Sequence, residues 1–334
     1  MPPPQTTSSP CTRRRRRVLA CAASIAVVLL TSAGTGHADP YAPPVDVPAL
    51  TPSTLDVRYA AERRSIEDAL TTARAVGDSG RTRTLGAFLR PGRRFLYFDP
   101  RGRGRAVEVI GDLARAHRVA VLVPGADTTV TAFDTRGDKP WSTPGGGARA
   151  LYTQAQNNTQ DLAVVAWLGY AAPETFSDDV LTDDRAGKGA VRLHHFLDEI
   201  HKVNPSAHVG LLCHSYGSVV CGRAAIDGPM GAAWRQVTDI ALFGSPGAAA
   251  PSAKAMSYTT RIWAGRGTSD WMEDVPHVRL LGLGLGPDPV SAPFGARLFD
   301  AGEAGHSDYL EPGSTSLRNL AAIAIGHPTS VTRG

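Results

Sequence analysis

The stretch His208-Val209-Gly210-Leu211-Leu212 runs directly into Cys213-His214-Ser215-Tyr216-Gly217, and an Ala- and Val-rich segment follows. The first five residues are mostly apolar, as in a strand covered on both faces, and the segment after Gly217 predicts a helix. A serine on a turn this sharp needs small residues two positions before and two after it. Gly217 meets that need on one side, while Cys213 replaces glycine on the other. We predict that Ser215 is a nucleophile; the alternative is a helix N-cap without chemistry.

Apolar runs of the same kind recur along the chain and alternate with candidate helices. The runs are Val119–Val123, Leu162–Ala166, His208–Leu212, Asp239–Phe243 and Arg261–Ala264, and the candidate helices span 147–156, 187–203, 216–226 and 315–325. Alternating strands and helices predict a mostly parallel sheet with helices on both faces, which is an α/β fold.

A further section precedes the first of these runs. Apolar residues at helical spacing predict a helix that starts at Ser53 or Thr54 and ends near Val76. Two short runs, 95–98 and 106–110, flank Gly102-Arg103-Gly104 and predict a hairpin. We therefore expect one domain over residues 54–334, with a helical and hairpin extension at its N-terminal end.

The N-terminus has the three parts of a secretory signal. Arg13–Arg17 is a basic run, Val18–Leu30 is an apolar run, and Gly36-His37-Ala38 supplies small residues for cleavage after Ala38. The apolar run is shorter than the roughly 20 residues that cross a bilayer, which disfavours the alternative, a membrane anchor. We expect a signal peptide over residues 1–38, a Pro-rich linker over 39–53, and a secreted protein. The pattern leaves the general and the twin-arginine export routes open.

Removal of the signal changes the charge of the chain. The five arginines leave with it, so that 30 basic and 31 acidic side chains remain, a formal charge of about −1. The basic isoelectric point of the whole chain is therefore no argument for nucleic acid or anionic lipid as a partner, and we predict neither, nor stable membrane insertion.

With the stretch Gly305-His306-Ser307-Asp308-Tyr309 near the C-terminus, the strand order and the serine turn resemble the α/β-hydrolase superfamily, in particular poorly characterised exported actinobacterial hydrolases. The resemblance covers the chain from Val119 to its end. The superfamily's order of nucleophile, acid and histidine falls on Ser215, Asp270 and His306. In such a set the imidazole takes the serine proton and the carboxylate orients the imidazole.

Two other carboxylates compete with Asp270 for the role of the acid. Asp270 follows the strand Arg261–Ala264 by six residues, in a loop at the carboxyl end of the predicted sheet, where ligand-binding groups gather. Asp274 and Asp288 remain alternatives, and Asp308 lies too close to His306 along the chain to be a comfortable partner.

Backbone donors for a developing oxyanion are expected at two places. The first is the N–H of Tyr216, directly after the serine. The second is the N–H of Ala126, in the loop after Val123 that stands where the resemblance expects a glycine-rich loop. A plain β-turn is the alternative for that loop.

No cofactor or metal is expected. Gly282-Leu283-Gly284-Leu285-Gly286 has alternating glycines but no phosphate-binding lysine after it, and no His, Cys and carboxylate cluster has zinc or calcium spacing. Cys11 and Cys21 leave with the signal. We expect Cys213 and Cys221 to be buried free thiols, because a strand end and the following helix need not direct their side chains at each other. A disulfide between them, which an exported protein could form, is the alternative.

Together these patterns predict a secreted serine esterase that acts on a small-molecule ester through an acyl-enzyme intermediate. Two alternatives stay open: a non-catalytic cell-surface binding protein on the same fold, and an amidase or peptidase variant. The sequence makes no prediction of oligomeric state.

Overall fold

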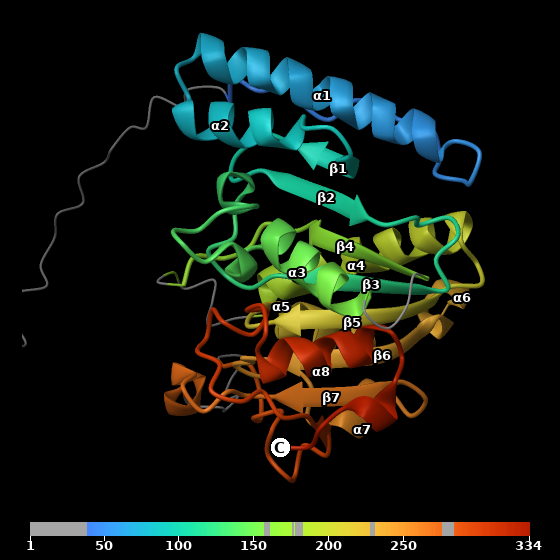
Figure 1. Ribbon diagram of the computed structural model, residues 1–334, viewed down its shortest axis with the longest axis vertical. Helices are drawn as coiled ribbons and strands as arrows, with labels where there is room; N and C mark the ends of the chain where they lie inside the picture. The colour runs from blue at the N-terminus through green and yellow to red at the C-terminus, as the bar shows by residue number, and fades with distance from the viewer. Residues whose placement is uncertain (1–38, 157–160, 176, 178–182, 228–230, 276–283) are drawn as a thin grey trace, which may run out of the picture. The chain divides into compact units, whose positions relative to one another are not determined.

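The computed structural model contains an eight-stranded sheet with the order β1-β2-β4-β3-β5-β6-β7-β8 (Figure 1). The residues described are 39–156, 161–175, 177, 183–227, 231–275 and 284–334, so the predicted signal lies outside them. The strands are β1 (Arg94–Asp99), β2 (Arg105–Ile110), β3 (Arg118–Val123), β4 (Leu162–Leu168), β5 (His208–His214), β6 (Val237–Phe243), β7 (Arg261–Gly265) and β8 (Arg297–Leu298).

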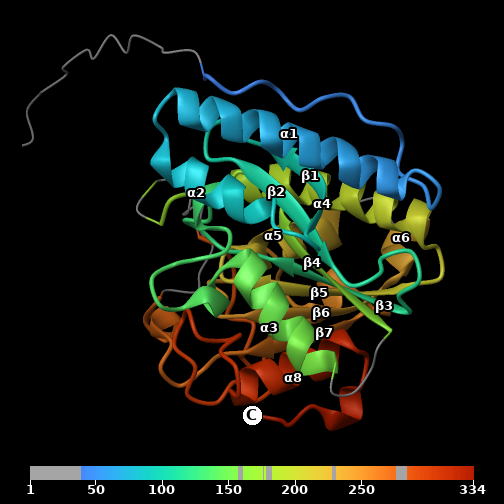
Figure 2. The same cartoon turned by 45° about the horizontal axis from the view of Figure 1, so that its top comes forward.

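The sheet is parallel from β4 to β8, whereas β1 and β2 add an antiparallel hairpin at one edge. Helices cover both faces (Figure 2). They are α1 (Leu55–Ala75), α2 (Ser79–Phe88), α3 (Pro144–Gln156), α4 (Asp184–Val203), α5 (Gly217–Asp227), α6 (Ala232–Arg235), α7 (Ala253–Met256) and α8 (Thr315–Ala324). The predicted α/β class with a mostly parallel sheet is confirmed, and so is the hairpin.

The core divides into two apolar layers, one on each side of the sheet. Strand β3 shows how the sequence builds both: Val119, Val121 and Val123 face the layer that includes α4 and α5, and Ala120 and Leu122 face the layer that includes α3 and α8. All five side chains are buried. Successive side chains of a strand point to opposite faces, so an unbroken apolar run is what a doubly covered strand requires.

The segment before α1 packs on the domain. It forms neither helix nor strand, but Tyr41 and Leu50 are buried in the core. The carboxylate of Asp39 accepts a hydrogen bond from the N–H of Gly102 at the tip of the hairpin (2.7 Å). Thr54 stands at the N-cap position of α1, although its hydroxyl donates to the carbonyl of Ala49 and does not cap the helix.

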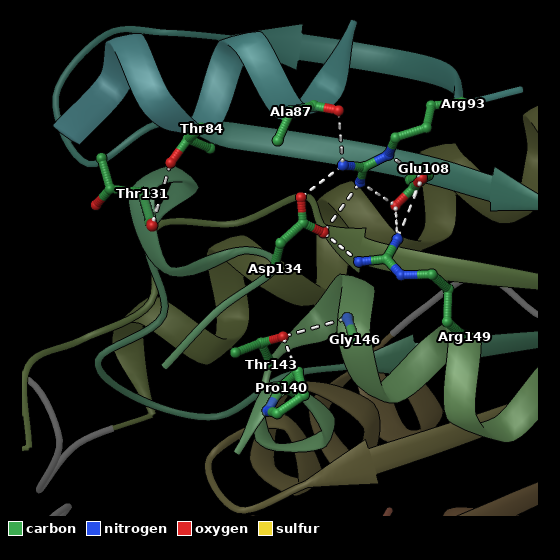
Figure 3. Close-up of polar contacts among 10 residues, drawn as sticks. All are labelled: Thr84, Ala87, Arg93, Glu108, Thr131, Asp134, Pro140, Thr143, Gly146 and Arg149. Carbon is green, nitrogen blue, oxygen red and sulfur yellow. Dashed lines mark hydrogen bonds and ion pairs between the residues drawn. The ribbon is translucent and has the colours of Figure 1, made fainter. Parts of the chain in front are cut away.

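A partly buried group of two arginines and two carboxylates connects the N-terminal extension to the rest of the domain (Figure 3). Arg93, before β1, donates two 2.6 Å hydrogen bonds to Glu108 of β2 and also binds Asp134. Arg149 of α3 binds the same two carboxylates. The four side chains thus join the hairpin, the loop after β3 and α3.

The fold brings several loops to one edge of the sheet. Because β3, β5, β6 and β7 run in the same direction, the segments that follow them, which begin at residues 124, 215, 244 and 266, meet at their carboxyl ends. This edge is where parallel α/β sheets bind ligands.

Candidate active site

Ser215 stands at the turn between β5 and α5 in a backbone conformation that is rare for residues other than glycine. Its φ is 51°, and its N–H donates to the carbonyl of Phe243 (2.9 Å). A Cβ atom at Gly217 would lie 2.4 Å from the carbonyl oxygen of Val123, so only glycine fits there. The tight turn and the strained φ hold the serine side chain at the carboxyl end of the sheet.

The expectation of free thiols at Cys213 and Cys221 was wrong, because the two form a disulfide. Cys213 ends the buried part of β5, and the sharp turn at Ser215 brings the second turn of α5 back against it, with the Cα atoms 6.5 Å apart. The prediction of free thiols did not take into account that the chain reverses between β5 and α5. The disulfide occupies the side of the turn where the pattern expects glycine.

His306 connects Ser215 to Asp270. Its Nε2 lies 3.0 Å from Ser215 Oγ, and its Nδ1 lies 2.9 Å from Asp270 Oδ1. Because a carboxylate accepts only, Nδ1 carries the proton and Nε2 is left to accept from the serine hydroxyl. The structure therefore brings the three side chains named from the sequence into one hydrogen-bonded chain.

Asp270 is buried and receives several donors. Besides His306, the N–H of Met272 donates to Oδ1 (3.0 Å) and the hydroxyl of Tyr309 donates to Oδ2 (2.5 Å). Burial alone would raise the pKa of Asp270, but the hydrogen bonds from His306, Tyr309 and Met272 outweigh it and hold the pKa below its ordinary value. The carboxylate is thus kept charged beside the imidazole.

Tyr309 has a role that the sequence reasoning missed. Its hydroxyl accepts from the N–H of Gly267 (3.1 Å) while it donates to Asp270, so it joins the loop after β7 to the histidine loop. Gly244, with φ of 55°, lies under the same group, and a Cβ there would come within 2.9 Å of Asp270 Oδ2. The tyrosine is visible in the sequence three residues after His306, but its partner lies 39 residues away and was not predictable from spacing.

His214 supports the histidine loop through the main chain. Its Nε2 donates to the carbonyl of His306 (2.7 Å), and its ring packs among those of Phe243, His306 and Tyr309. Burial, with the nearby His306, lowers the pKa of His214 to about 3, so the ring is neutral. From the sequence, His214 was expected beside the turn, without a role in the site.

The competing carboxylates lie elsewhere. Asp274 is exposed on a short 3-10 helix, Trp271–Asp274. Asp288 pairs with Arg266 (2.6 Å), and Asp308 pairs with Lys139 (2.9 Å) and accepts from the indole N–H of Trp141. Of the carboxylates considered from the sequence, Asp270 is the one hydrogen-bonded to His306.

A pocket of about 420 Å³ opens over Ser215 and His306. Ala126 and Tyr216, the two expected oxyanion donors, both belong to its lining. The loop that carries Ala126 touches the serine, since a Cβ at Gly125 would lie 2.6 Å from Ser215 Cβ. The hydroxyl of Tyr170 holds this loop by donating to the carbonyl of Pro124 (2.7 Å).

Comparison with known proteins agrees with this fold. A family model described as alpha/beta hydrolase matches residues 99–280, and the chain belongs to that family. The uncharacterized protein Rv2079 of Mycobacterium tuberculosis is 30% identical over an alignment of 260 residues, which covers 68% of this chain and 38% of that protein. Rv0963c of the same species is 34% identical over 152 residues, 45% of this chain and 54% of that protein. The chain thus spans only part of the length of these relatives.

Two solved structures are similar at low identity. A serine hydrolase without lid from Xanthomonas campestris is 13% identical, with a TM-score of 0.40, over 71% of this chain and 94% of that one. A cutinase from Trichoderma reesei is 15% identical, also with a TM-score of 0.40, over 83% and 99% of the two chains.

Within the described ranges, no group of three or more His, Cys, Asp and Glu side chains could hold a metal ion. A search of the same residues found no helix long and apolar enough to cross a membrane.

Proposed function

We propose that this hydrolase cleaves carboxylic esters through an acyl-enzyme intermediate, with Ser215 as nucleophile, His306 as general base and Asp270 as the orienting carboxylate. The observation that carries the proposal is the hydrogen-bonded chain in which His306 lies 3.0 Å from Ser215 Oγ and 2.9 Å from Asp270 Oδ1. Serine hydroxyls are weak nucleophiles at neutral pH, and this arrangement activates them.

In the proposed reaction, Ser215 Oγ attacks the ester carbonyl while His306 Nε2 takes its proton. The carbonyl oxygen becomes an oxyanion, which the N–H groups of Tyr216 and Ala126 stabilise; one such donor is typically worth about 100- to 1,000-fold in rate. Collapse expels the alcohol, which receives the proton from His306. A water molecule, deprotonated by the same imidazole, then attacks the acyl-serine. The bond between the acyl carbon and Ser215 Oγ breaks, the acid leaves, and His306 returns the proton to Ser215 Oγ.

The proposed location is outside the cytoplasm, after cleavage behind Ala38. The layout of residues 1–38 supports export. The disulfide between Cys213 and Cys221 supports it independently, because structural disulfides persist mainly in oxidising compartments. The expected partner is a small-molecule ester.

The first alternative is a binding protein that keeps the fold without turnover, and the second is an amidase or peptidase. The position of His306 between Ser215 and Asp270 favours a working nucleophile over the binder. The same three residues can cleave an ester or an amide bond, so hydrolysis of matched ester and amide substrates has to be compared.

A fluorophosphonate probe tests the proposal directly. We expect the folded protein to be labelled at Ser215, and Ser215→Ala to remove both labelling and hydrolysis of phenyl butyrate without changing the thermal midpoint by more than a few degrees. A folded wild-type protein that is neither labelled nor active would support the binding protein. Labelling combined with cleavage of butyranilide but not of phenyl butyrate would support the amidase.

A further inference from the structure

Resting on the proposed esterase function, we infer that the substrate is an amphiphilic ester with an anionic group, a carboxylate or a phosphate, that binds Arg136. Arg136 would then determine substrate specificity from outside the hydrogen-bonded chain of Ser215, His306 and Asp270.

The pocket over Ser215 has one apolar and one polar wall. The apolar wall comes from segments after β6 and β7 and includes Pro246, Trp271, Met272, Val275 and Leu285. Trp271 is half exposed and packs on the ring of His306, with ring centroids 4.8 Å apart. An apolar part of a substrate lying on this wall would leave water, which favours binding.

The polar wall comes from the loop after β3 and the loop after β4. It includes Asp127, Thr128, Arg136, Ser142 and Thr175. Ser215 follows β5, which has β3 and β4 on one side and β6 and β7 on the other, so an ester at the serine can extend toward both groups of segments. The pocket therefore fits a molecule that is apolar on one side of the ester and polar on the other.

Arg136 supplies the only positive side chain in the part of this pocket that the structure describes. Other cations nearby are paired: Arg103 with Glu174, Lys139 with Asp308, and Arg266 with Asp288. The guanidinium of Arg136 is exposed, and no hydrogen bond or ion pair with another described residue involves it. Its charge is thus available to a ligand at the mouth of the pocket.

Asp127, the single carboxylate among the described residues of the pocket, is close enough for the charge of Arg136 to act on it: burial would raise its pKa, but the hydrogen bonds from Thr175 and the charges of Arg136 and Arg103 lower it. Asp127 uses one oxygen to accept from the N–H of Thr175 (3.0 Å) and the other to accept from its hydroxyl (2.6 Å), and it makes no ion pair with Arg136. A guanidinium presents several N–H donors in one plane and binds carboxylates and phosphates with two hydrogen bonds. An anion on the substrate is the chemistry that this unpaired group recognises.

Three esters separate the contributions of charge and position. Phenyl butyrate is neutral, 4-carboxyphenyl butyrate carries a carboxylate on the alcohol side, and the monophenyl ester of glutaric acid carries one on the acyl side. We expect Arg136→Gln to lower kcat/KM for at least one anionic ester about tenfold, through KM, and to leave the neutral ester within about twofold. The ester that responds shows which side of the substrate faces Arg136.

Two further variants control the experiment. Arg136→Lys keeps the charge and should recover part of the loss, which a purely structural role of the arginine would not allow. Arg64→Gln removes one charge from an exposed position on α1 and should leave all three esters unchanged. Raising the salt from 20 to 300 mM should reduce the effect of Arg136→Gln, since an exposed ion pair is screened.

Equal effects of Arg136→Gln on all three esters, or no effect on any of them, would overturn the inference and leave the esterase proposal standing. A wild-type protein that hydrolyses none of the three and resists the fluorophosphonate probe would overturn the esterase proposal, and the inference with it. The two failures are therefore distinguishable.

Discussion

At the scale of single residues, the position of His306 depends on side chains from other segments, because Tyr309 binds the carboxylate that orients its ring and His214 binds its main-chain carbonyl. Ser215 and His306 could be named from sequence because a strand-turn-helix and a Gly-His-Ser loop have local signatures. Tyr309 and His214 could not be given roles, since their partners, Asp270 and the carbonyl of His306, come from distant segments. Side chains that orient others are defined by tertiary contacts, and a single sequence does not contain those contacts.

The acid can be identified by replacing each candidate with asparagine. We expect Asp270→Asn to lower kcat on phenyl butyrate by about 10⁴-fold, because the amide cannot hold His306 in the tautomer that accepts from Ser215. Asp274→Asn and Asp288→Asn should stay near wild type, since neither side chain contacts His306. Circular dichroism should show all three folded. A crippled Asp288→Asn beside an active Asp270→Asn would contradict the assignment.

Tyr309→Phe tests whether the buried hydroxyl holds the charge on Asp270. A carboxylate whose pKa is depressed by folding stabilises the protein above its unfolded pKa, and this stability is lost as the pH falls through its folded pKa. Without the tyrosine donor, the pKa of Asp270 should rise and its contribution should shrink. We expect Tyr309→Phe to lower the free energy of unfolding by about 1–2 kcal/mol at pH 7.

The difference between Tyr309→Phe and wild type should then decrease as the pH falls through the folded-state pKa of Asp270 in the variant. Its charge-dependent part should disappear once the pH is also below the lower folded-state pKa of Asp270 in wild type. Urea unfolding at several values between pH 3 and pH 7 measures it. A difference that stays constant over this range would mean that the hydroxyl acts only through its bond with Gly267, and not through the charge of Asp270.

At the scale of helices and strands, apolar patterns were sufficient for the elements with buried faces and failed for one mostly polar helix and for two four-residue helices. Strands β3 to β7 were predicted because both of their faces are buried, so the sequence is apolar throughout. Helix α2 was missed because it is mostly polar and only Leu85 and Phe88 are buried. The four-residue helices α6 and α7 are too short to show a period.

The disulfide joins β5 to α5 and should contribute measurably to the free energy of unfolding of the domain. Replacing both cysteines with alanine, Cys213→Ala with Cys221→Ala, opens a loop whose ends are eight residues apart and should lower the free energy of unfolding by about 2.5 kcal/mol, as judged by urea unfolding. Activity per folded molecule should remain within about tenfold, because Ser215, His306 and Asp270 are untouched. An unchanged unfolding midpoint would show that the bond contributes nothing to the stability of the turn.

At the scale of the whole molecule, the hairpin extends the parallel sheet from its edge. The family model starts at residue 99, within β1, so α1, α2 and most of β1 lie outside the matched part. Even so, β2 pairs with β4 from Ala106 to Ile110, and residues 39–334 form one compact unit. This continuity implies that the N-terminal extension and the family-matched part of the domain unfold together.

Arg93→Met tests that coupling. Arg93 connects Glu108 of β2 to Asp134 of the loop after β3, and its loss leaves a buried and a partly buried carboxylate with Arg149 as their remaining cation (Figure 3). Removing one partner from a buried ionic group typically costs about 3–5 kcal/mol. We expect urea unfolding, followed by circular dichroism and by tryptophan fluorescence, to show one transition at a lower midpoint by both probes.

Arg90→Met is the matched control. Arg90 lies three residues before Arg93 and is exposed, so this substitution removes the same charge from a position outside the ionic group. Its midpoint should stay near that of wild type. If Arg93→Met instead gave two separate transitions, the N-terminal extension would unfold independently of the rest of the domain. We expect a single transition because β2 is paired with β4, and β4 is paired with β3 inside the sheet. The hairpin cannot separate from the sheet without breaking the pairing of β2 with β4.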